Sequence, residues 1–327
     1  MSASYPIVRP RRLRRTPALR RLVAETALRP DDLVLPVFVK EGIAEPQPVS
    51  SMPGVVQHTR DSLRKAAAEA ADAGVGGIIV FGIPSVKDDR GTQADDPDGV
   101  SQQALADIRS ETGDELVVMA DLCLCEYTDH GHCGILSSDG QVLNDPTLER
   151  YAATAVAQAR AGAHVVAPSG MMDGQVGVIR AALDAAGFEE TAICAYSVKY
   201  ASAFYGPFRE AAEGAPKFGD RSTHQQDPAN VEESLREVGL DLAEGADMIM
   251  IKPALAYLDV IRRVADEVRV PVAAYQVSGE FAMVEAAAAN GWLDRDKTIM
   301  ETLTAIRRAG AGFVLTYWAT EVARRLG

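Results

Sequence analysis

Short apolar runs alternate with polar turns and alanine-rich stretches from about residue 33 to the end of the chain. The runs are apolar at consecutive positions rather than at every second one, a pattern typical of strands covered on both faces in a parallel sheet. The eight runs are LVLPVFVK (33–40), GGIIVFG (76–82), LVVMADL (116–122), AHVVAPS (163–169), TAICAYSVK (191–199), DMIMIK (247–252), PVAAYQVS (271–278) and GFVLTYW (312–318). They predict eight strands separated by helices.

The stretches between the runs have the composition of helices. Two clear examples span residues 59–74 and 144–162, which open on a capping Thr or Asn and close near a Gly. Eight strand–helix alternations favour a (β/α)8 TIM barrel, with a doubly wound open sheet as the alternative. No linker interrupts the pattern. We therefore expect a single catalytic barrel domain over residues 31–327, preceded by an N-terminal arm for subunit association over residues 1–30.

Two connections are longer than a barrel requires. They span residues 84–99 and 205–230, and both are polar and rich in Gly, Pro and charged residues. Loops of this length are uncommon in a compact domain and are often active-site lids. A surface insertion is the alternative for each.

Composition places the chain among ordinary globular proteins. It has 327 residues, of which 47% are hydrophobic and 24% charged. It has no run of about 18 apolar residues for a membrane span, and its N-terminus lacks the apolar block of a secretory signal. Three of its four cysteines lie within eleven residues, which suits metal or redox chemistry better than a disulfide scaffold. We expect a cytoplasmic protein without a membrane partner.

The charge is distributed unevenly along the chain. The net charge is −13, but residues 1–21 carry seven arginines and no acidic residue, which leaves −20 on the rest. A basic arm would suit either nucleic acid or the acidic surface of a neighbouring subunit. The rest of the chain has no second basic stripe and no interleaved aromatic residues, so we expect no nucleic-acid partner. The arm is better explained as the association segment of a homo-oligomer.

Two lysines are the last residues of predicted strands. Lys199 ends AYSVK and Lys252 ends MIMIK, in a chain with only seven lysines. A barrel carries its reactive groups at the carboxyl ends of its strands, so the two ammonium groups should lie close together at the mouth. Burial and like-charge repulsion lower the pKa of a lysine, and a neutral lysine attacks a carbonyl to form a Schiff base. A rim lysine extending into solvent is the alternative for either residue alone; Lys40 also ends a strand, without a second supporting feature.

The segment MADLCLCEYTDHGHCGIL (119–136) contains a second group of candidate functional residues. Cys123 and Cys125 lie two residues apart at a strand end, so their thiols face the same side, and Cys133 follows a seven-residue loop. Three thiolates with an open fourth position are typical of catalytic zinc. A fourth ligand from a loop histidine would make a structural zinc site instead. Three buried thiols without a metal are the remaining alternative. Asp121 would orient the metal site or move protons, unless it only caps a helix.

A lysine pair and an open zinc site in one barrel mouth indicate a carbonyl condensation with metal assistance. The chain resembles the porphobilinogen synthase (5-aminolevulinate dehydratase) family over essentially its whole length. The resemblance is carried by RPRRLRRTPALRRLVAET, DLCLCEYTDHGHCG, APSGMMDGQV, YSVKYASAFYGPFREA, MIMIKPALAYLDV, YQVSGEFAM and AGFVLTYW. It implies an enzyme that condenses two 5-aminolevulinate molecules to porphobilinogen with loss of two waters, in tetrapyrrole (haem) biosynthesis.

The resemblance also implies roles for individual residues. Lys252 would form a Schiff base with the first substrate and Lys199 with the second. Ser278 and Tyr317 match residues that bind the carboxylate of the first substrate. The residues that match those binding the second substrate lie on the suspected lid: Arg209, Arg221 and Gln225. Guanidinium groups suit this role because they bind carboxylates through two hydrogen bonds.

Metal usage and assembly follow from the same resemblance. Family members with the three cysteines bind catalytic zinc, which implies Zn²⁺ here. Bacterial members often add an allosteric Mg²⁺ at a subunit interface, whose glutamate matches Glu237, with an arm arginine such as Arg14 nearby; a solvated helix face is the alternative for Glu237. The family arm wraps a partner subunit and builds a homo-octamer. Three residues stand where many relatives have Asp, Tyr and Pro, and we expect them to affect metal affinity and the lid more than the reaction: Gly170, His224 and Glu126.

Two other functions are alternatives to the dehydratase. One is a class I aldolase-like barrel with structural cysteines and a single reactive lysine. The other is a non-catalytic scaffold that uses the cysteines as a zinc clasp and the arm for partners. Two strand-end lysines and the lid arginines Arg209 and Arg221 favour the dehydratase over the aldolase, and neither feature has a purpose in a scaffold.

Overall fold

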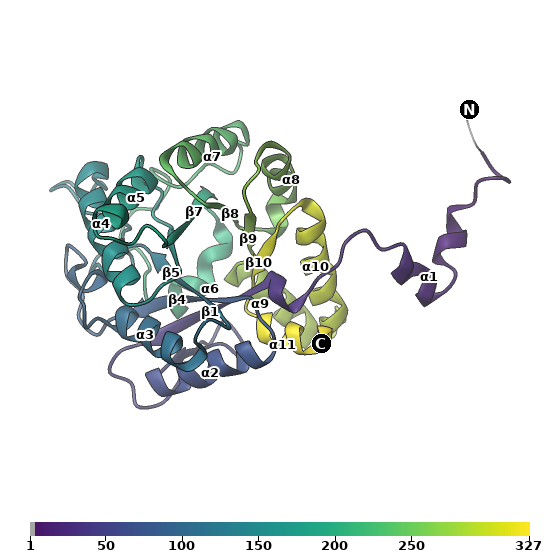
Figure 1. Cartoon of the computed structure of the whole chain (residues 1–327), viewed down its shortest axis with the longest axis horizontal. Helices are drawn as coiled ribbons and strands as arrows, with labels where there is room; N and C mark the ends of the chain where they lie inside the picture. The colour runs from purple at the N-terminus through teal and green to yellow at the C-terminus, as the bar shows by residue number, and fades with distance from the viewer. Residues whose placement is uncertain (1–3) are drawn as a thin grey trace.

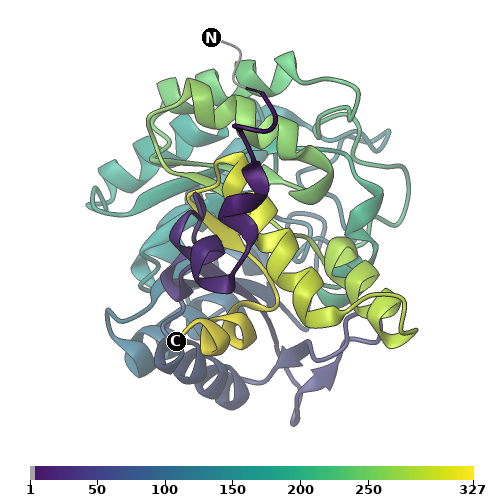
Figure 2. The same cartoon turned by 90° about the vertical axis from the view of Figure 1, so that its right-hand side faces the viewer.

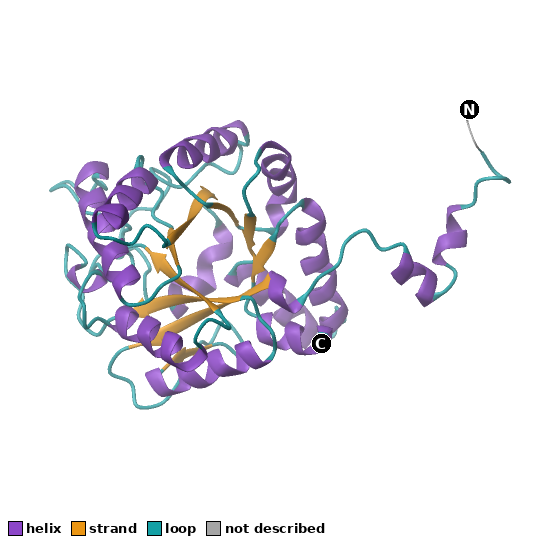
Figure 3. Cartoon of the chain, in the orientation of Figure 1, coloured by secondary structure: helices purple, strands orange, loops and turns teal. Residues whose placement is uncertain are grey.

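Eight parallel strands close into a barrel. The computed structural model describes residues 4–327 of the chain. In order around the barrel the strands are β1 (Leu33–Lys40), β4 (Gly77–Ile83), β5 (Val117–Leu122), β6 (Val165–Pro168), β7 (Ala192–Lys199), β8 (Met248–Lys252), β9 (Val272–Tyr275) and β10 (Phe313–Leu315). Pairing of β10 with β1 closes the ring (Figure 3). The predicted TIM barrel is confirmed, and each of the eight apolar runs overlaps one of its strands.

Helices surround the strands on the outside (Figure 1). They are α2 (Arg60–Asp72), α3 (Val100–Thr112), α4 (Asn144–Arg160), α5 (Gln175–Ala185), α7 (Glu232–Glu244), α8 (Leu258–Glu267), α9 (Ser278–Ala289), α10 (Arg295–Ala309) and α11 (Ala319–Leu326). Thr59 caps α2 as expected, because its side chain accepts a hydrogen bond from Ser62 N. Asn144 does not cap α4; its amide group instead hydrogen-bonds the backbone of Asp173 in the loop after β6.

The remaining elements lie in the connections that follow the strands. After β1, a hairpin of β2 (Gln47–Pro48) and β3 (Val56–His58) pairs with the end of β1. The long connection 205–230 contains α6 (Gly206–Ala211) near its start and has little other regular structure. Within residues 4–327, no helix combines the length and the apolar character that a membrane span requires.

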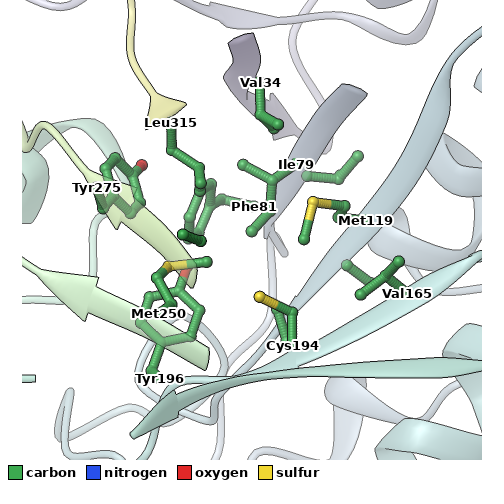
Figure 4. Packing of buried hydrophobic residues seen from close by; sticks show 14 of the residues in the cluster. Val34, Ile79, Phe81, Met119, Val165, Cys194, Tyr196, Met250, Tyr275 and Leu315 are labelled. Atoms are coloured by element: carbon green, nitrogen blue, oxygen red, sulfur yellow. The ribbon is translucent and has the colours of Figure 1, made fainter. Parts of the chain in front are cut away.

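Apolar side chains fill the inside of the barrel (Figure 4). The labelled residues are Val34, Ile79, Phe81, Met119, Val165, Cys194, Tyr196, Met250, Tyr275 and Leu315. On β7, Cys194 and Tyr196 both point inward, two positions apart as the alternation of a strand requires (Figure 4). This core supports the carboxyl ends of the strands, where the chemistry-bearing residues lie.

Residues 4–29 extend away from the barrel (Figures 1 and 2). This arm contains a short 3-10 helix (Pro10–Arg14) and α1 (Pro17–Leu22), and none of its described residues is buried. Several of its apolar side chains are exposed: Tyr5, Ile7, Val8, Leu13, Leu22 and Val23. The division into an association arm and a catalytic domain stays a prediction.

Candidate active site

Lys199 and Lys252 are register partners at the ends of β7 and β8. Both are buried, with 5% and 4% of their surface exposed. Nζ of Lys199 donates a hydrogen bond to Ser169 O, and Nζ of Lys252 lies 4.2 Å from the ring centroid of Tyr275 and 4.8 Å from that of Phe208. Burial, reinforced by the charge of Lys199, lowers the pKa of Lys252 to about 7. A substantial fraction of Lys252 is therefore the free amine that Schiff-base formation requires at neutral pH.

A register shift in β7 makes this pairing possible. It lies between Ala195 and Val198, where β7 has one residue more than β8. Such a bulge changes the direction of the side chains that follow it. Tyr196 points into the barrel, so simple alternation would turn Val198 inward next. With the extra residue, Lys199 takes the position opposite Lys252 instead.

Gln226, at the end of the long connection 205–230, holds this bulge. Its side-chain nitrogen donates to Ser197 O at 3.1 Å, and its backbone nitrogen donates to Lys199 O at 3.0 Å. Ser234 of α7 donates to its side-chain oxygen at 2.8 Å. Sequence reasoning missed this residue, because a glutamine in a polar loop gives no signal until its partners are placed.

The thiols of Cys123, Cys125 and Cys133 lie within 4.8 Å of one another, and all three residues are buried. Within residues 4–327 no other three His, Cys, Asp or Glu side chains form such a group. Hydrogen bonds from the thiols of Cys125 and Cys133 lower the pKa of Cys123 well below its usual value. A compact set of soft donors, one of them readily deprotonated, fits zinc.

The two loop histidines lie apart from the thiol group. His130 Nε2 is 3.2 Å from Asp89 O, and the ring of His132 lies 4.8 Å from the ring of Phe218 in the connection 205–230. Neither ring joins the three thiols, so no four-ligand structural site forms within the described residues. The set that the structure contains is three thiols alone.

Asp121, in β5, is buried beside the lysines. Its Oδ2 accepts a hydrogen bond from Ser169 Oγ at 3.1 Å, while its Oδ1 has no partner within residues 4–327. Burial, together with the charges of Glu126 and Cys123, raises the pKa of Asp121 to about 8. The residue caps no helix among those described, and at neutral pH its carboxyl group carries a proton that it can donate.

One pocket brings these groups together. It is a small cavity of about 20 Å³, lined by Phe81, Asp121, Cys125, Glu126, Ser169, Lys199, Tyr205, Phe208, Arg209, Arg221 and Lys252. Arg209 is exposed, whereas Arg221 is buried and donates to Gly131 O at 3.0 Å and to Gly214 O at 2.7 Å. Arg221 therefore also ties the connection 205–230 to the cysteine loop.

Ser278 and Tyr317 lie on the Lys252 side of this pocket. The Tyr317 hydroxyl is 3.1 Å from that of Tyr275, the ring beside Lys252 Nζ. Ser278 is fully buried at the start of α9, and its Oγ accepts a hydrogen bond from Phe208 N at 2.9 Å. Ser278 thus contacts the backbone of Phe208 and Tyr317 contacts Tyr275, but neither residue lines the lysine pocket itself.

The sequence profile of the delta-aminolevulinic acid dehydratase family matches residues 7–325. The chain belongs to this family. The delta-aminolevulinic acid dehydratase of Streptomyces coelicolor is 65% identical over 325 residues, which cover 99% of this chain and 98% of the relative. That of Bacillus subtilis is 52% identical over 326 residues, covering 100% and 99% of the two chains.

A solved structure agrees with the sequence comparisons. The crystal structure of the Toxoplasma gondii dehydratase (porphobilinogen synthase), in complex with the reaction product porphobilinogen, matches with a TM-score of 0.95 and 40% sequence identity. The match covers 97% of this chain and 91% of that one. The dehydratase predicted from the sequence is thereby confirmed, in preference to an aldolase-like barrel or a scaffold.

Two residues that the sequence analysis assigned to this dehydratase border a second pocket instead. Gln225 and Glu237 line a space of about 360 Å³ between the connection 205–230, the loop after β6, and α7. Glu237 is half-buried there rather than on a solvated helix face, and burial together with the charges of Asp173 and Glu233 raises its pKa. Gln225 does not line the lysine pocket.

Two of the three unusual residues also lie near these pockets. Glu126 is buried, lines the lysine pocket, and its carboxylate accepts a hydrogen bond from the Cys125 thiol at 3.2 Å. His224 lines the second pocket, and burial lowers its pKa to about 4, so its ring is neutral. The third, Gly170, is packed against Tyr151 of α4.

Proposed function

We propose that this dehydratase condenses two 5-aminolevulinate molecules to porphobilinogen through Schiff bases on Lys252 and Lys199, with zinc held by the cysteine triad. The observation that carries the proposal is that both lysines and Cys125 line one pocket at the carboxyl ends of the strands. A single-lysine aldolase would need neither the second buried amine nor the thiols.

Lys252 is suited to bind the first substrate. Its neutral amine would add to the substrate's ketone, and loss of water would leave a Schiff base. Protonated Asp121 would supply a proton to the departing hydroxyl. Ser278 and Tyr317 lie on the same side of the pocket, where their hydroxyls would bind the carboxylate of this substrate.

Lys199 would hold the second substrate in the same way. Arg209 and Arg221 line the pocket with it, and their guanidinium groups would bind the second carboxylate. Arg209 is exposed and can reach a ligand without breaking a hydrogen bond within the described residues. Lys199 and Lys252 are register partners, so two substrates bound to them would lie side by side, in the proximity that a condensation requires.

The metal would be held by Cys123, Cys125 and Cys133. When bound, zinc would polarise a substrate oxygen or bind an amine as a Lewis acid. The Arg221 guanidinium lies close to the triad and would offset part of the charge of three thiolates. Cys125 also lines the lysine pocket, so a metal bound to the triad would lie next to that pocket.

Three further assignments belong to the proposal. Glu237 would contribute to an allosteric Mg²⁺ site, which fits its half-buried place beside Asp173 and Glu233, where a cation would relieve repulsion between carboxylates. The exposed basic arm would join subunits into a homo-octamer. Four free cysteines suit the reducing cytoplasm.

The proposal is tested by supplying 5-aminolevulinate to the purified chain and following the product by mass spectrometry. We expect porphobilinogen at one molecule per two substrates consumed. A chelator should abolish its formation without unfolding the barrel, and added zinc should restore it.

Two cysteine variants make this test specific. Cys133→Ala should lose zinc and activity, whereas Cys194→Ala, which changes a buried cysteine inside the barrel and outside the triad, should keep both (Figure 4). Full activity in metal-free protein would contradict the zinc assignment.

A further inference from the structure

Gly170 has no room for a side chain. A Cβ atom built on it would lie 1.6 Å from the hydroxyl oxygen of Tyr151 and 2.4 Å from the adjoining ring carbon. Tyr151 is fully buried in α4, so its ring cannot swing aside in a close-packed interior. The φ angle of Gly170 is not positive, so space rather than backbone conformation requires glycine here.

The Tyr151 hydroxyl is directed at the cysteine loop. It donates a hydrogen bond to Cys133 O at 2.7 Å. The ring thus fills the space beside Gly170 and ends against the backbone of the third cysteine. Changing this one tyrosine would affect both neighbours.

Thr147, one helical turn earlier on α4, contacts the residues that follow Cys133. Its Oγ1 accepts a hydrogen bond from Ile135 N at 2.9 Å. A Cβ atom on Gly134 would lie 2.4 Å from that same oxygen. Residues four apart share one face of a helix, so Thr147 and Tyr151 together hydrogen-bond the backbone on both sides of Gly134.

We propose that Tyr151 and Thr147 form a clamp that positions Cys133 within the zinc-binding triad, and that Gly170 is glycine because the clamp occupies its side-chain space. This inference rests on the proposed zinc site. Cys123 and Cys125 directly follow β5, whereas Cys133 comes from a loop and depends on other contacts for its place. An Asp at position 170 is incompatible with this form of the clamp.

The first test removes the hydroxyl alone. In Tyr151→Phe, the Kd for Zn²⁺, measured by competition with a chromophoric chelator, should rise about 10-fold to 100-fold, as for other groups that orient metal ligands. Tyr200→Phe is the matched control, because Tyr200 is also fully buried and donates to a backbone carbonyl, that of Asn230, at 2.8 Å. We expect no change of the zinc Kd in this control. An unchanged Kd in Tyr151→Phe would overturn the clamp.

The second test fills the space beside Gly170 with a methyl group. Gly170→Ala should weaken zinc binding in the parent chain, because the new methyl group would clash with the Tyr151 hydroxyl and disturb its hydrogen bond to Cys133 O. The same change should have little effect in a Tyr151→Leu background, where the methyl group has room. Equal losses of zinc affinity in the two backgrounds would contradict the inference.

The two levels of the proposal fail differently. A parent chain that binds no zinc in the competition assay would refute the zinc site and the clamp together. A parent that binds zinc, with Tyr151→Phe binding it equally well, would refute the clamp alone and leave the proposed reaction standing.

Discussion

At the residue scale, the lysine pocket depends on burial acting on titratable groups. Lys252 loses its water and faces a second ammonium, and both effects favour its neutral form. Asp121 loses its water as well, and the same physics favours its protonated form. At neutral pH the pocket therefore contains an amine that can attack and a carboxyl group that can donate a proton.

The rate of Schiff-base formation at Lys252 should rise with pH. The amine reacts only when deprotonated, and its pKa is lowered from 10.5 to about 7, so the rate should increase through about pH 7. Above about pH 8 it should fall again, because Asp121 then loses the proton that it donates. Lys199→Met removes the like charge, which should raise the pKa of Lys252 and move the midpoint to higher pH. Borohydride trapping at a series of pH values, with mass spectrometry of the Lys252 peptide, measures both. A parent midpoint near the ordinary lysine pKa would contradict this account.

The sequence indicates candidate site residues more readily than it indicates the residues that pack around them. Lysines at strand ends and closely spaced cysteines are recognisable because few other residues in the chain share their chemistry and spacing. The contacts of Tyr151 with Gly170 and Cys133 were not predictable, since they join α4, the loop after β6 and the cysteine loop across three separate segments. Asn144 was expected to cap its own helix, but a partner from another loop, Asp173, takes its amide group.

At the element scale, continuous apolar runs predicted all eight barrel strands because burial on both faces leaves a strong signal. The bulge in β7 leaves none. It inserts a residue between Ala195 and Val198 without changing the apolar run, and it becomes visible only when the register with β8 is known. The sequence thus predicted that Lys199 reaches the barrel mouth, but not how it comes to face Lys252.

Gln226→Met should impair Lys199 selectively. The substitution keeps the size of the side chain but removes its hydrogen bonds to Ser197 and Ser234, which leaves the bulge less firmly held. We expect trapping of substrate at Lys199 to fall about 10-fold or more relative to Lys252, since small misplacements of reacting groups are costly.

Gln102→Met is the matched control for this prediction. Gln102 is also buried and donates to a backbone carbonyl, that of Ala94, outside the lysine pocket. Its trapping ratio should match the parent. An equal fall at both lysines in Gln226→Met would indicate general destabilisation rather than positioning.

The two arginines of the connection 205–230 should behave differently when changed. Arg209→Ala should weaken use of the second substrate while leaving zinc affinity unchanged, because the Arg209 side chain is exposed and lies on α6. Arg221→Ala should weaken both, because it also breaks the hydrogen bond to Gly131 O that ties the cysteine loop to the connection 205–230. Steady-state kinetics combined with zinc competition separates the two effects. Identical zinc affinities in the two variants would contradict the structural role of Arg221.

At the scale of the whole molecule, the arm is the segment that does not pack into the barrel. Over residues 4–22, its side-chain hydrogen bonds join residues of the arm itself, as from Arg12 to Ile7 O and from Arg20 to Arg14 O. Its arginines and exposed apolar side chains therefore remain available to another surface. The rest of the chain carries −20, which makes a second copy the complementary partner.

Deletion of residues 1–20 should yield smaller assemblies and reduced activity. Light scattering of the full chain and the truncated chain measures the change in mass. Because the proposed contacts are partly electrostatic, high salt should move the full chain in the same direction. An unchanged mass after deletion would show that the arm is not an assembly segment and would reopen the nucleic-acid alternative.

The central claim is that two lysines of one pocket each bind a substrate molecule covalently. Borohydride reduction in the presence of 5-aminolevulinate, followed by peptide mass mapping, tests it most directly. We expect adducts on Lys252 and Lys199 and none on Lys40, which ends β1 but does not line the lysine pocket. Adducts on only one of the two pocket lysines, or on neither, would contradict the account.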